Sequence, residues 1–464
     1  LIDDLTIDIV GRCITTLEDE WRFKFTEESF NSMRIYGVLA ILRHQKHLLS
    51  LQENEKETVY KYNEYNWAKS LFEMFHKELG VDLSDDEVVF FAIQLLCSGL
   101  MHDSGYEENN AYKYDEKMKE FIRVVISSIS DVLNIDLDND EELYKGLLNH
   151  IRPAIFRMKF EKHNTKDLTN FVKEEYKETY RVSWILSMLF EEYYGINISS
   201  TELSYITLYI QSALERAYKP AKIVLVTELG MGLNQMFCNK IRMAIPKVDK
   251  ILIVSLRDFD ISLLNDYDLI ITTSNINIDD DRIIQISSLL NEEGLSLIKQ
   301  SIRNLNNRKI SKKPRFDVSC HSFFDPSLIF THVKMTDKTQ IIEMLTNKML
   351  EKGYVKEKFL ASVLKREKAV STCLGNGVAI PHGNSNYVND SKVAIAFLDQ
   401  PISWDSDDEQ ISAIFLLGFQ IDNPKSSKQV QLFYKVFLKL IETDENVERL
   451  KTLSREELYK ELVS

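Results

Sequence analysis

A histidine stands between a proline and a glycine at the end of the segment Gly375-Asn376-Gly377-Val378-Ala379-Ile380-Pro381-His382-Gly383. The apolar run at 378–380 predicts a strand, so the histidine is expected where that strand ends. Pro381 restricts the backbone that approaches His382, and Gly383 leaves room for another surface to come close. Because a neutral imidazole nitrogen is a competent nucleophile toward phosphorus, His382 is a candidate for covalent chemistry. The alternative is a histidine that only satisfies hydrogen bonds in a turn.

Further residues around this segment follow a recognisable pattern. Arg366 and Glu367 precede it, Thr372 leads into it, and the runs Val393-Ala394-Ile395-Ala396-Phe397 and Ile402-Ser403-Trp404-Asp405 follow it. Together they resemble the enzyme IIA proteins of the mannitol/fructose type in the bacterial sugar phosphotransferase system. The resemblance covers most of the last third of the chain. It implies an α/β domain in which His382 accepts a phosphoryl group, with Arg366, Gly377 and Gly383 as supporting residues.

The chain departs from this family at one position. The family keeps a second histidine on the helix after the next strand, and Gln429 occupies that place here. Glutamine can donate a hydrogen bond but cannot hold a titrating proton. The resemblance therefore implies that Gln429 orients His382 or a phosphoryl oxygen, and that onward transfer of the phosphoryl group is impaired.

Length and composition limit what these residues can belong to. A chain of 464 residues is too long for one core and predicts three or four domains. The formal net charge of −14 repels phosphate backbones, so DNA contact would need a separate basic module. The longest apolar stretch, residues 88–101, is too short to span a bilayer. Because the chain starts at Leu1 without a methionine, we expect it to be a fragment.

The number and spacing of the cysteines bear on metal binding and on the cellular compartment. The five cysteines are scattered and form no Cys-x-x-Cys or Cys/His cluster, so no metal site or cofactor is predicted. A reducing cytoplasm is the simplest interpretation.

An internal repeat is visible in the first half of the chain, where apolar residues recur at helical spacing. The segment 80–87 aligns with 195–202, and both end in a capping box, Ser84 with Glu87 and Ser199 with Glu202. Similar apolar helices follow each segment. Two copies of one helical domain are the natural inference.

The repeat resembles the PTS regulation domain, which occurs in pairs in regulators of sugar operons. The match is clearest at 147–157, where the family's regulatory histidine corresponds to His150. The resemblance implies that the other family histidines are replaced by Tyr36, Gln94 and Tyr209. A buried, hydrogen-bonding His150 is the alternative to a phosphorylated one.

A parallel-sheet pattern follows residues 217–221. Apolar runs at 223–226, 250–254 and 268–273 alternate with a glycine turn and a helix, which indicates a βαβ unit. The Gly230-x-Gly232 pair lacks the third glycine of a dinucleotide-binding loop. The segment instead resembles the galactitol-type enzyme IIB fold, whose phosphorylated cysteine position holds Thr227. A threonine hydroxyl is a much weaker nucleophile than a thiolate without a dedicated base, so this domain is expected to be degenerate.

The expected fold class is multidomain: two all-α bundles, an α/β IIB-like domain with a parallel sheet, and an α/β IIA-like domain. The expected boundaries are 1–107 and 108–218 for the two PTS regulation domains, 219–303 for the IIB-like domain, 304–318 for a polar linker and 319–464 for the IIA-like domain.

Three functions remain open. This domain order resembles the activators of sugar-utilisation operons, which implies HPr and IIB-type proteins as partners, a homodimer, no membrane association, and DNA binding only through a module before Leu1. A soluble IIA–IIB subunit of a sugar permease is the second possibility, and it would need an intact IIB nucleophile. The third is a dimerising regulator scaffold that is not phosphorylated.

Overall fold

The computed structural model describes residues 4–43, 49–101, 116–133, 135–160, 162, 166–217, 220–245, 248–278, 280–287, 291–307, 314–369, 371–404 and 410–464. It divides into two compact units. One comprises Leu1–Val132, Leu137–Gln211 and Arg315–Ser464, and the other comprises Leu133–Asp136 and Ser212–Pro314.

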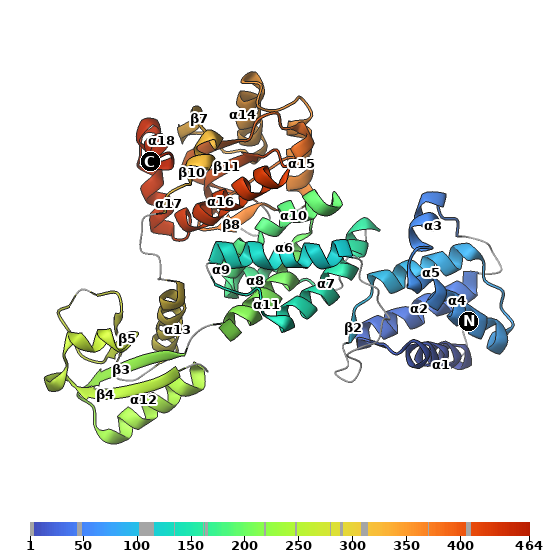
Figure 1. Ribbon diagram of the computed structural model, residues 1–464, viewed down its shortest axis with the longest axis horizontal. Coiled ribbons are helices and arrows are strands. Elements are labelled where there is room, and N and C mark those ends of the chain that lie inside the picture. The colour runs from blue at the N-terminus through green and yellow to red at the C-terminus, as the bar shows by residue number, and fades with distance from the viewer. Residues whose placement is uncertain are drawn as a thin grey trace. The chain divides into compact units, whose positions relative to one another are not determined.

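The first half of the chain is helical, as predicted (Figure 1). The first bundle contains α1 (Asp4–Trp21), α2 (Glu27–Arg43), α3 (Glu53–Val59), α4 (Asn63–Leu79) and α5 (Asp85–Cys97), with a short antiparallel pair of β1 (Lys24–Phe25) and β2 (Leu100–Met101). The second contains α6 (Glu116–Leu133), α7 (Glu141–Lys159), α8 (Thr169–Glu175), α9 (Lys177–Ser183), α10 (Ile185–Tyr194) and α11 (Ser200–Ala217).

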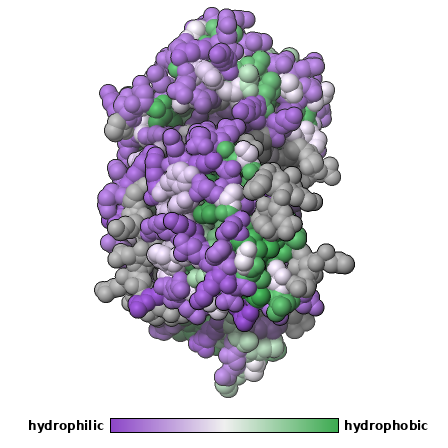
Figure 2. Space-filling view, turned by 90° about the vertical axis from the view of Figure 1, so that its right-hand side faces the viewer, coloured by the Kyte–Doolittle hydropathy of each residue, from purple (hydrophilic) through white to green (hydrophobic). Residues whose placement is uncertain are grey.

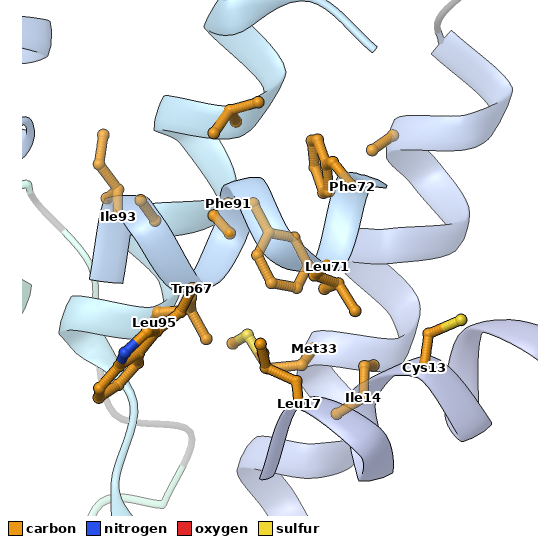
Figure 3. Packing of buried hydrophobic residues seen from close by; sticks show 14 of the residues in the cluster. Cys13, Ile14, Leu17, Met33, Trp67, Leu71, Phe72, Phe91, Ile93 and Leu95 are labelled. Carbon is orange, nitrogen blue, oxygen red and sulfur yellow. The ribbon is translucent and has the colours of Figure 1, made fainter. Parts of the chain in front are cut away.

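The core of the first bundle follows from the helical spacing of its apolar residues. Trp67, Leu71 and Phe75 lie four positions apart on α4, and each is at most 1% exposed. Figure 3 shows side chains from α1, α2, α4 and α5 packing together around this face. The Trp67 indole also stacks on Phe23, with ring centroids 4.7 Å apart.

The internal repeat has the same backbone in both copies. α4 and α10 each end at a glycine in the left-handed region, Gly80 with φ 65° and Gly195 with φ 64°. Ser84 and Ser199 then accept hydrogen bonds from Glu87 N and Glu202 N at the starts of α5 and α11. The two segments therefore form the same turn between two helices.

The predicted capping boxes are wrong in their second half. The Glu87 carboxylate binds the guanidinium of Arg43, at 2.8 and 3.1 Å, instead of returning to the serine backbone. Glu202 binds Arg157 in the same way, at 2.5 and 2.8 Å. A buried carboxylate gains more from a charged, two-pronged donor than from one backbone amide.

The middle domain is built on a parallel sheet, as predicted. Its strand order is β4 (Val248–Ser255), β3 (Ala221–Thr227), β5 (Leu269–Thr272), β6 (Ile283–Gln285), and each neighbouring pair is parallel. Alternate residues of β3 enter different cores: Ile223 and Leu225 pack with residues of α12 (Met231–Ala244) and α13 (Glu292–Asn307), and Val224 packs on the other face. Cys238 lies in the first of these cores, so it is a packing residue.

The last domain contains a mixed sheet with the order β7 (Phe324–Val333), β10 (Lys392–Ser403), β11 (Gln410–Gly418), β9 (Val378–Ala379), β8 (Cys373–Gly375). The pairs β10–β11 and β8–β9 are antiparallel, while β7–β10 and β9–β11 are parallel. The helices are α14 (Lys338–Glu351), α15 (Phe359–Ala369), α16 (Pro424–Leu440), α17 (Asp444–Lys451) and α18 (Arg455–Leu462). The sheet is sandwiched between an aliphatic core that includes residues of α14 and α15 and an aromatic cluster that includes Phe415, Phe433 and Phe437.

The expected linker differs in its limits. α13 continues to Asn307, past the expected boundary at 303, and a 3-10 helix begins at Val318. Residues 308–313 of the expected linker lie outside the described residues.

The surface is mostly polar on the face shown in Figure 2, where apolar side chains form several separate groups, the largest of them at the lower right. On α2, the side chains of Ile35, Leu39 and Leu42 are 59%, 40% and 49% exposed. Because they are spaced four and three residues apart, they form one apolar stripe on that helix.

Candidate functional site

The turn before His382 has a backbone that its sequence explains. Gly375, Asn376 and Gly377 all have positive φ values, 83°, 53° and 69°. Only glycine and, less readily, asparagine adopt this conformation at low cost. A Cβ on Gly377 would also lie 3.1 Å from Ser412 Oγ. The turn joins β8 to β9 and brings the chain alongside β11, where His382 pairs with Leu417.

Gly383 supports the site by permitting close packing. A Cβ at this position would lie 2.6 Å from Phe359 and 2.7 Å from Ser362 Oγ, both on α15. Ser362 Oγ also accepts a hydrogen bond from Asn384 N at 3.0 Å. The surface that approaches Gly383 is therefore α15 of the same domain.

The His382 imidazole is held in one tautomer. Its Nδ1 lies 3.0 Å from Ile380 O, and because a carbonyl oxygen only accepts, Nδ1 carries the proton. Nε2 is buried and has no hydrogen-bond partner within the described residues. Burial holds the pKa of His382 well below its usual range, and the charge of Arg366 lowers it further. His382 is thus neutral, with a free electron pair on Nε2.

Arg366 is a second unusual group beside this imidazole. The residue is 4% exposed, and its Nε and Nη2 have no partners among the residues described. Burial lowers the pKa of Arg366, while the charge of Glu191 opposes that shift. Its Nη1 donates a hydrogen bond to Asn197 Oδ1 in the second bundle. Two buried N–H donor groups therefore remain available for an anion beside His382.

Glu367, Thr372 and Trp404 are structural residues. The Glu367 carboxylate accepts hydrogen bonds from Thr372 Oγ1 at 2.6 Å and from Trp404 Nε1 at 2.7 Å. Lys338 Nζ lies 3.0 Å from the same carboxylate. This buried network fixes the end of α15 against the strands and so holds Arg366 in place.

Residues that the sequence did not single out complete the site. A cavity of about 30 Å³ adjoins His382 and is lined by Glu191 of α10 and Tyr434 of α16, among others. The Trp184 ring meets the imidazole edge to face, with centroids 6.3 Å apart at 88°. Tyr434 lies on α16, five positions after Gln429. Because the sequence already placed Gln429 on a helix near His382, that helix could have been searched for further site residues. Trp184 and Glu191 belong to another domain, and no local pattern indicates their role.

The expectation that Gln429 orients His382 is wrong in this arrangement. The Gln429 side-chain amide donates to Ser319 O and lies 3.4 Å from Ser322 Oγ. These acceptors belong to the 3-10 helix Val318–Phe323.

His150 lies in a second polar site, between α7 and α11. Its Nε2 is 3.1 Å from Glu202 Oε2, and the same carboxylate binds Arg157. Burial raises the pKa of Glu202, but the nearby His150 imidazole and the hydrogen bonds from Arg157 outweigh it and hold that pKa at about 2. Glu202 is therefore ionised beside the imidazole.

Tyrosines flank His150 on α11. The rings of Tyr205 and Tyr209 lie 5.5 and 5.6 Å from the imidazole, centroid to centroid. In the first bundle, Tyr36 contacts Phe90 with centroids 6.0 Å apart, while the Arg43–Glu87 pair matches Arg157–Glu202. This correspondence supports the alignment of Tyr36 with His150.

Thr227 ends β3 in the parallel-sheet domain, and it is 3% exposed. Its Oγ1 accepts a hydrogen bond from Leu229 N at 3.0 Å, and Thr273 Oγ1 lies 3.4 Å away. The hydroxyl is thus used within the turn. No group of residues that could hold a metal ion is found within the described ranges.

Comparison with known families identifies the domains. Residues 12–97 and 123–213 match the PRD domain, and residues 322–464 match the family described as "Phosphoenolpyruvate-dependent sugar phosphotransferase system, EIIA 2". The chain therefore contains two PRD domains followed by a type-2 EIIA domain, as the sequence resemblances indicated.

The chain is also homologous to two regulators of Bacillus subtilis (strain 168). It is 26% identical to "Transcriptional regulator ManR" over 91% of this chain, and 23% identical to "Probable licABCH operon regulator" over 93%. The chain spans 65% of the length of each of these relatives.

Shorter matches concern the last domain alone. The "Mannitol-specific phosphotransferase enzyme IIA component" of Halalkalibacterium halodurans is 31% identical over 25% of this chain and 77% of its own length. The crystal structure of IIA mannitol from Escherichia coli, 22% identical, covers 30% of this chain and 96% of its own, with a TM-score of 0.26. Of the helices within the described ranges, none combines the length and apolarity needed to cross a membrane.

Proposed function

We propose that this chain is the signal-receiving part of a transcriptional activator of a sugar-utilisation operon, in which His382 is phosphorylated by the phosphotransferase system. The observation that carries the proposal is the neutral, buried Nε2 of His382 beside the unpartnered donors of Arg366, within a type-2 EIIA domain that follows two PRD domains. The chain is proposed to act in the cytoplasm as a phosphoacceptor and not as an enzyme.

The chemical step is an in-line phosphoryl transfer from a IIB-type phosphocysteine protein. The Nε2 electron pair forms the new N–P bond, while the donor's S–P bond breaks and its electron pair leaves with the sulfur as thiolate. The Nδ1 proton stays on its hydrogen bond to Ile380 O. The Nε and Nη2 donors of Arg366, which have no partners among the described residues, are available to bind phosphoryl oxygens.

The signal is the charge that this step adds. A phosphoryl group brings nearly two negative charges and three strong acceptor oxygens, which changes local packing and domain contacts. A regulator can use that change to report how fast its sugar is transported.

His150 is proposed as a second input, phosphorylated by HPr. Glu202 opposes phosphorylation at this site. Its carboxylate lies 3.1 Å from His150 Nε2, where a phosphoryl group on that nitrogen would have to be placed. Phosphorylation at His150 Nε2 therefore requires the imidazole to leave Glu202, which would also disturb the Arg157 pair.

The residues at 219–303 are proposed to be a degenerate IIB-like domain that relays signals without carrying phosphate. Its support is the parallel sheet and the use of the Thr227 hydroxyl within its own turn. The proposed domain limits are 1–107, 108–218 and 319–464, with the IIB-like domain extended from 219–303 to Asn307, where α13 ends, and a linker after it.

A homodimer is the proposed assembly, and the apolar stripe of Ile35, Leu39 and Leu42 offers surface for self-association. DNA binding is assigned to a module outside these residues. Light scattering of the purified chain gives its mass and so tests the homodimer. Sequence-specific DNA binding by this chain at moderate salt would contradict the assignment of DNA binding to another module.

Two other functions are less well supported. A permease subunit would need a IIB nucleophile, whereas Thr227 is buried and hydrogen-bonded. A scaffold that is never phosphorylated would have no use for a neutral histidine beside a partly unpaired buried arginine.

Phosphorylation in vitro tests the proposal. The chain is incubated with phosphoenolpyruvate, enzyme I, HPr and candidate IIB proteins, and acid-labile phosphate is mapped by mass spectrometry. We expect phosphate on His382 that the His382→Gln variant loses. The control is His332→Asn, at an exposed histidine of the same domain whose φ of 58° asparagine tolerates.

The same variants in the full gene product test the regulatory role. His382→Gln is expected to change transcription of the target operon, while His332→Asn leaves it unchanged. An unmodified His382 with every donor, together with unchanged transcription, would refute the proposal.

A further inference from the structure

The face of the EIIA domain that carries His382 is covered by the second PRD domain. Trp184 lies against the imidazole, and Glu191 of α10 lines the cavity that adjoins it. Trp184 is 1% exposed and Glu191 is partly buried, which raises the pKa of the Glu191 carboxyl. The His382 Nε2 has no access to solvent here.

Polar contacts around this face tie the two domains together. The Arg366 guanidinium donates to Asn197, at the turn before α11. Ser427 Oγ of α16 lies 3.2 Å from Glu192 Oε2, and Lys428 Nζ lies 2.7 Å from Asp131 Oδ2 of α6.

A fourth contact reaches the turn that precedes His382. Arg181 Nη1 of α9 donates to Ile441 O at 3.3 Å and to Glu442 O at 3.0 Å. Asn376 Nδ2 donates to the same two carbonyl groups, at 3.0 and 2.7 Å. The second PRD domain is thus linked to the backbone that positions the turn at 375–377.

We propose that the second PRD domain, through α9, α10 and Asn197, occupies the phosphoacceptor face of the EIIA domain in cis, and that this contact and phosphate on His382 exclude each other. The inference rests on the proposed function, because it concerns the same histidine. The closed contact is then the unphosphorylated state, and phosphorylation by a docked donor stabilises an open one.

Space is the first reason. The cavity of about 30 Å³ beside His382 holds about two water molecules. A phosphoryl group adds a phosphorus and three oxygens at Nε2, and a donor protein must bring its own phosphorylated side chain in line with that nitrogen. Neither fits while α10 is in place.

Charge is the second reason. A phosphoryl group on Nε2 would lie beside Glu191 in a cavity of only about 30 Å³, where like charges repel more strongly than in bulk water. Its oxygens would also compete with Asn197 for Arg366. The group that binds the second PRD domain in the closed state would thus bind phosphate in the open state.

The two states are linked reciprocally. A donor reaches His382 only in the open state, so the apparent rate of phosphorylation is the intrinsic rate multiplied by the open fraction. Phosphate on His382 must weaken the domain contact by the same coupling free energy by which the contact disfavours phosphate.

Chemical modification of His382 tests the contact without any donor. The variant Asp131→Lys/Glu192→Lys changes only residues of the second PRD domain. It removes the acceptors of Lys428 and Ser427 and places positive charges there, which should weaken the contact. The matched control is Glu174→Lys/Glu175→Lys, on the exposed part of α8. Diethyl pyrocarbonate is applied to each full chain, and modified histidines are quantified by mass spectrometry, with His332 (79% exposed side chain) as the internal reference.

We expect His382 of the native chain to react at least tenfold more slowly than His332, and the Asp131→Lys/Glu192→Lys chain to react several-fold faster at His382. The control should behave like the native chain. Equal reactivity of His382 and His332 in the native chain, or no acceleration in the variant, would overturn the inference.

Hydrogen exchange before and after phosphorylation separates this inference from the proposed function. If His382 is phosphorylated, α9 and α10 should lose protection while α5 keeps it. Phosphorylation with unchanged exchange in α10 would refute the inference and leave the proposed function standing. If the Asp131→Lys/Glu192→Lys chain opens in the modification experiment but His382 is never phosphorylated, the proposed function is refuted and the domain contact stands.

Discussion

The Trp184 indole meets the His382 imidazole edge to face, with ring centroids 6.3 Å apart, although the two residues are separated by 198 positions in the sequence. This contact joins the second PRD domain to the EIIA domain at the atom group that would accept phosphate. It also explains why His382 is neutral, since burial is the main cause of its lowered pKa.

That lowered pKa predicts a pH dependence of stability. An unfolded histidine binds a proton near pH 6.5, but the buried His382 does so only at lower pH. The unfolded chain therefore binds more protons below about pH 6.5, and stability falls as pH falls through that window, by at most about 1.4 kcal/mol per pH unit for this one group.

The difference between the native chain and His382→Gln isolates this effect. Burial raises the pKa values of Glu191 and Glu192, so these two carboxyl groups make the folded chain more stable, relative to the unfolded chain, as pH falls. Arg366 and Tyr434 stay protonated in this range. Denaturant unfolding between pH 7.5 and 5.5 should show a steeper loss for the native chain than for His382→Gln. Parallel curves would contradict a buried, neutral His382.

The Gly383→Ala variant should destabilise the EIIA domain. The added Cβ would meet Phe359 and Ser362 at 2.6 and 2.7 Å, and overpacking of this kind costs about 1–3 kcal/mol. Thermal unfolding measures the loss, with Gly11→Ala as the control. Its Cβ would meet only Arg34 Cδ at 3.8 Å within α1, so Gly11→Ala should leave stability unchanged or raise it.

Breaking the arginine–glutamate pair should reduce folding stability more in the second PRD domain than in the first. Glu202→Ala leaves Arg157, 8% exposed, as a buried unpaired charge, which costs about 3–5 kcal/mol. Glu87→Ala should cost less, because the Arg43 side chain is 26% exposed and can reach water. Denaturant unfolding gives the difference, and hydrogen exchange should locate the first loss in α7 and α11. Equal costs for both variants would contradict the role assigned to burial.

Restoring a histidine at position 429 should not create a phosphate relay. The Gln429 side chain is directed to Ser319 and Ser322, so the Gln429→His imidazole would lie away from His382. We expect unchanged phosphorylation of His382 and no gain in transfer back to a IIB protein. A several-fold gain in that transfer rate would show that α16 turns toward His382.

Much of the fold was predictable because its signals are local. The continuous apolar run in β3 indicates a strand that is buried on both faces. The helical spacing of Trp67, Leu71 and Phe75 reports which face of α4 is buried, whatever it is buried against. The repeat was visible because Gly80 and Gly195 fill positions that a side chain would strain. The capping boxes were mistaken for a related reason: the serine caps are local, but the arginines that bind Glu87 and Glu202 are 44 and 45 residues away.

The sequence by itself determined that His382 stands between a proline and a glycine at the end of a strand, and it marked Arg366 as a supporting residue through the family resemblance. These features depend on backbone conformation and residue type within a few tens of residues. Only the tertiary structure decided that Gln429 points elsewhere, that Glu202 holds His150, and that Trp184, Glu191 and Asn197 cover the acceptor. Such contacts depend on how whole domains pack, and packing leaves no periodic trace in a single sequence.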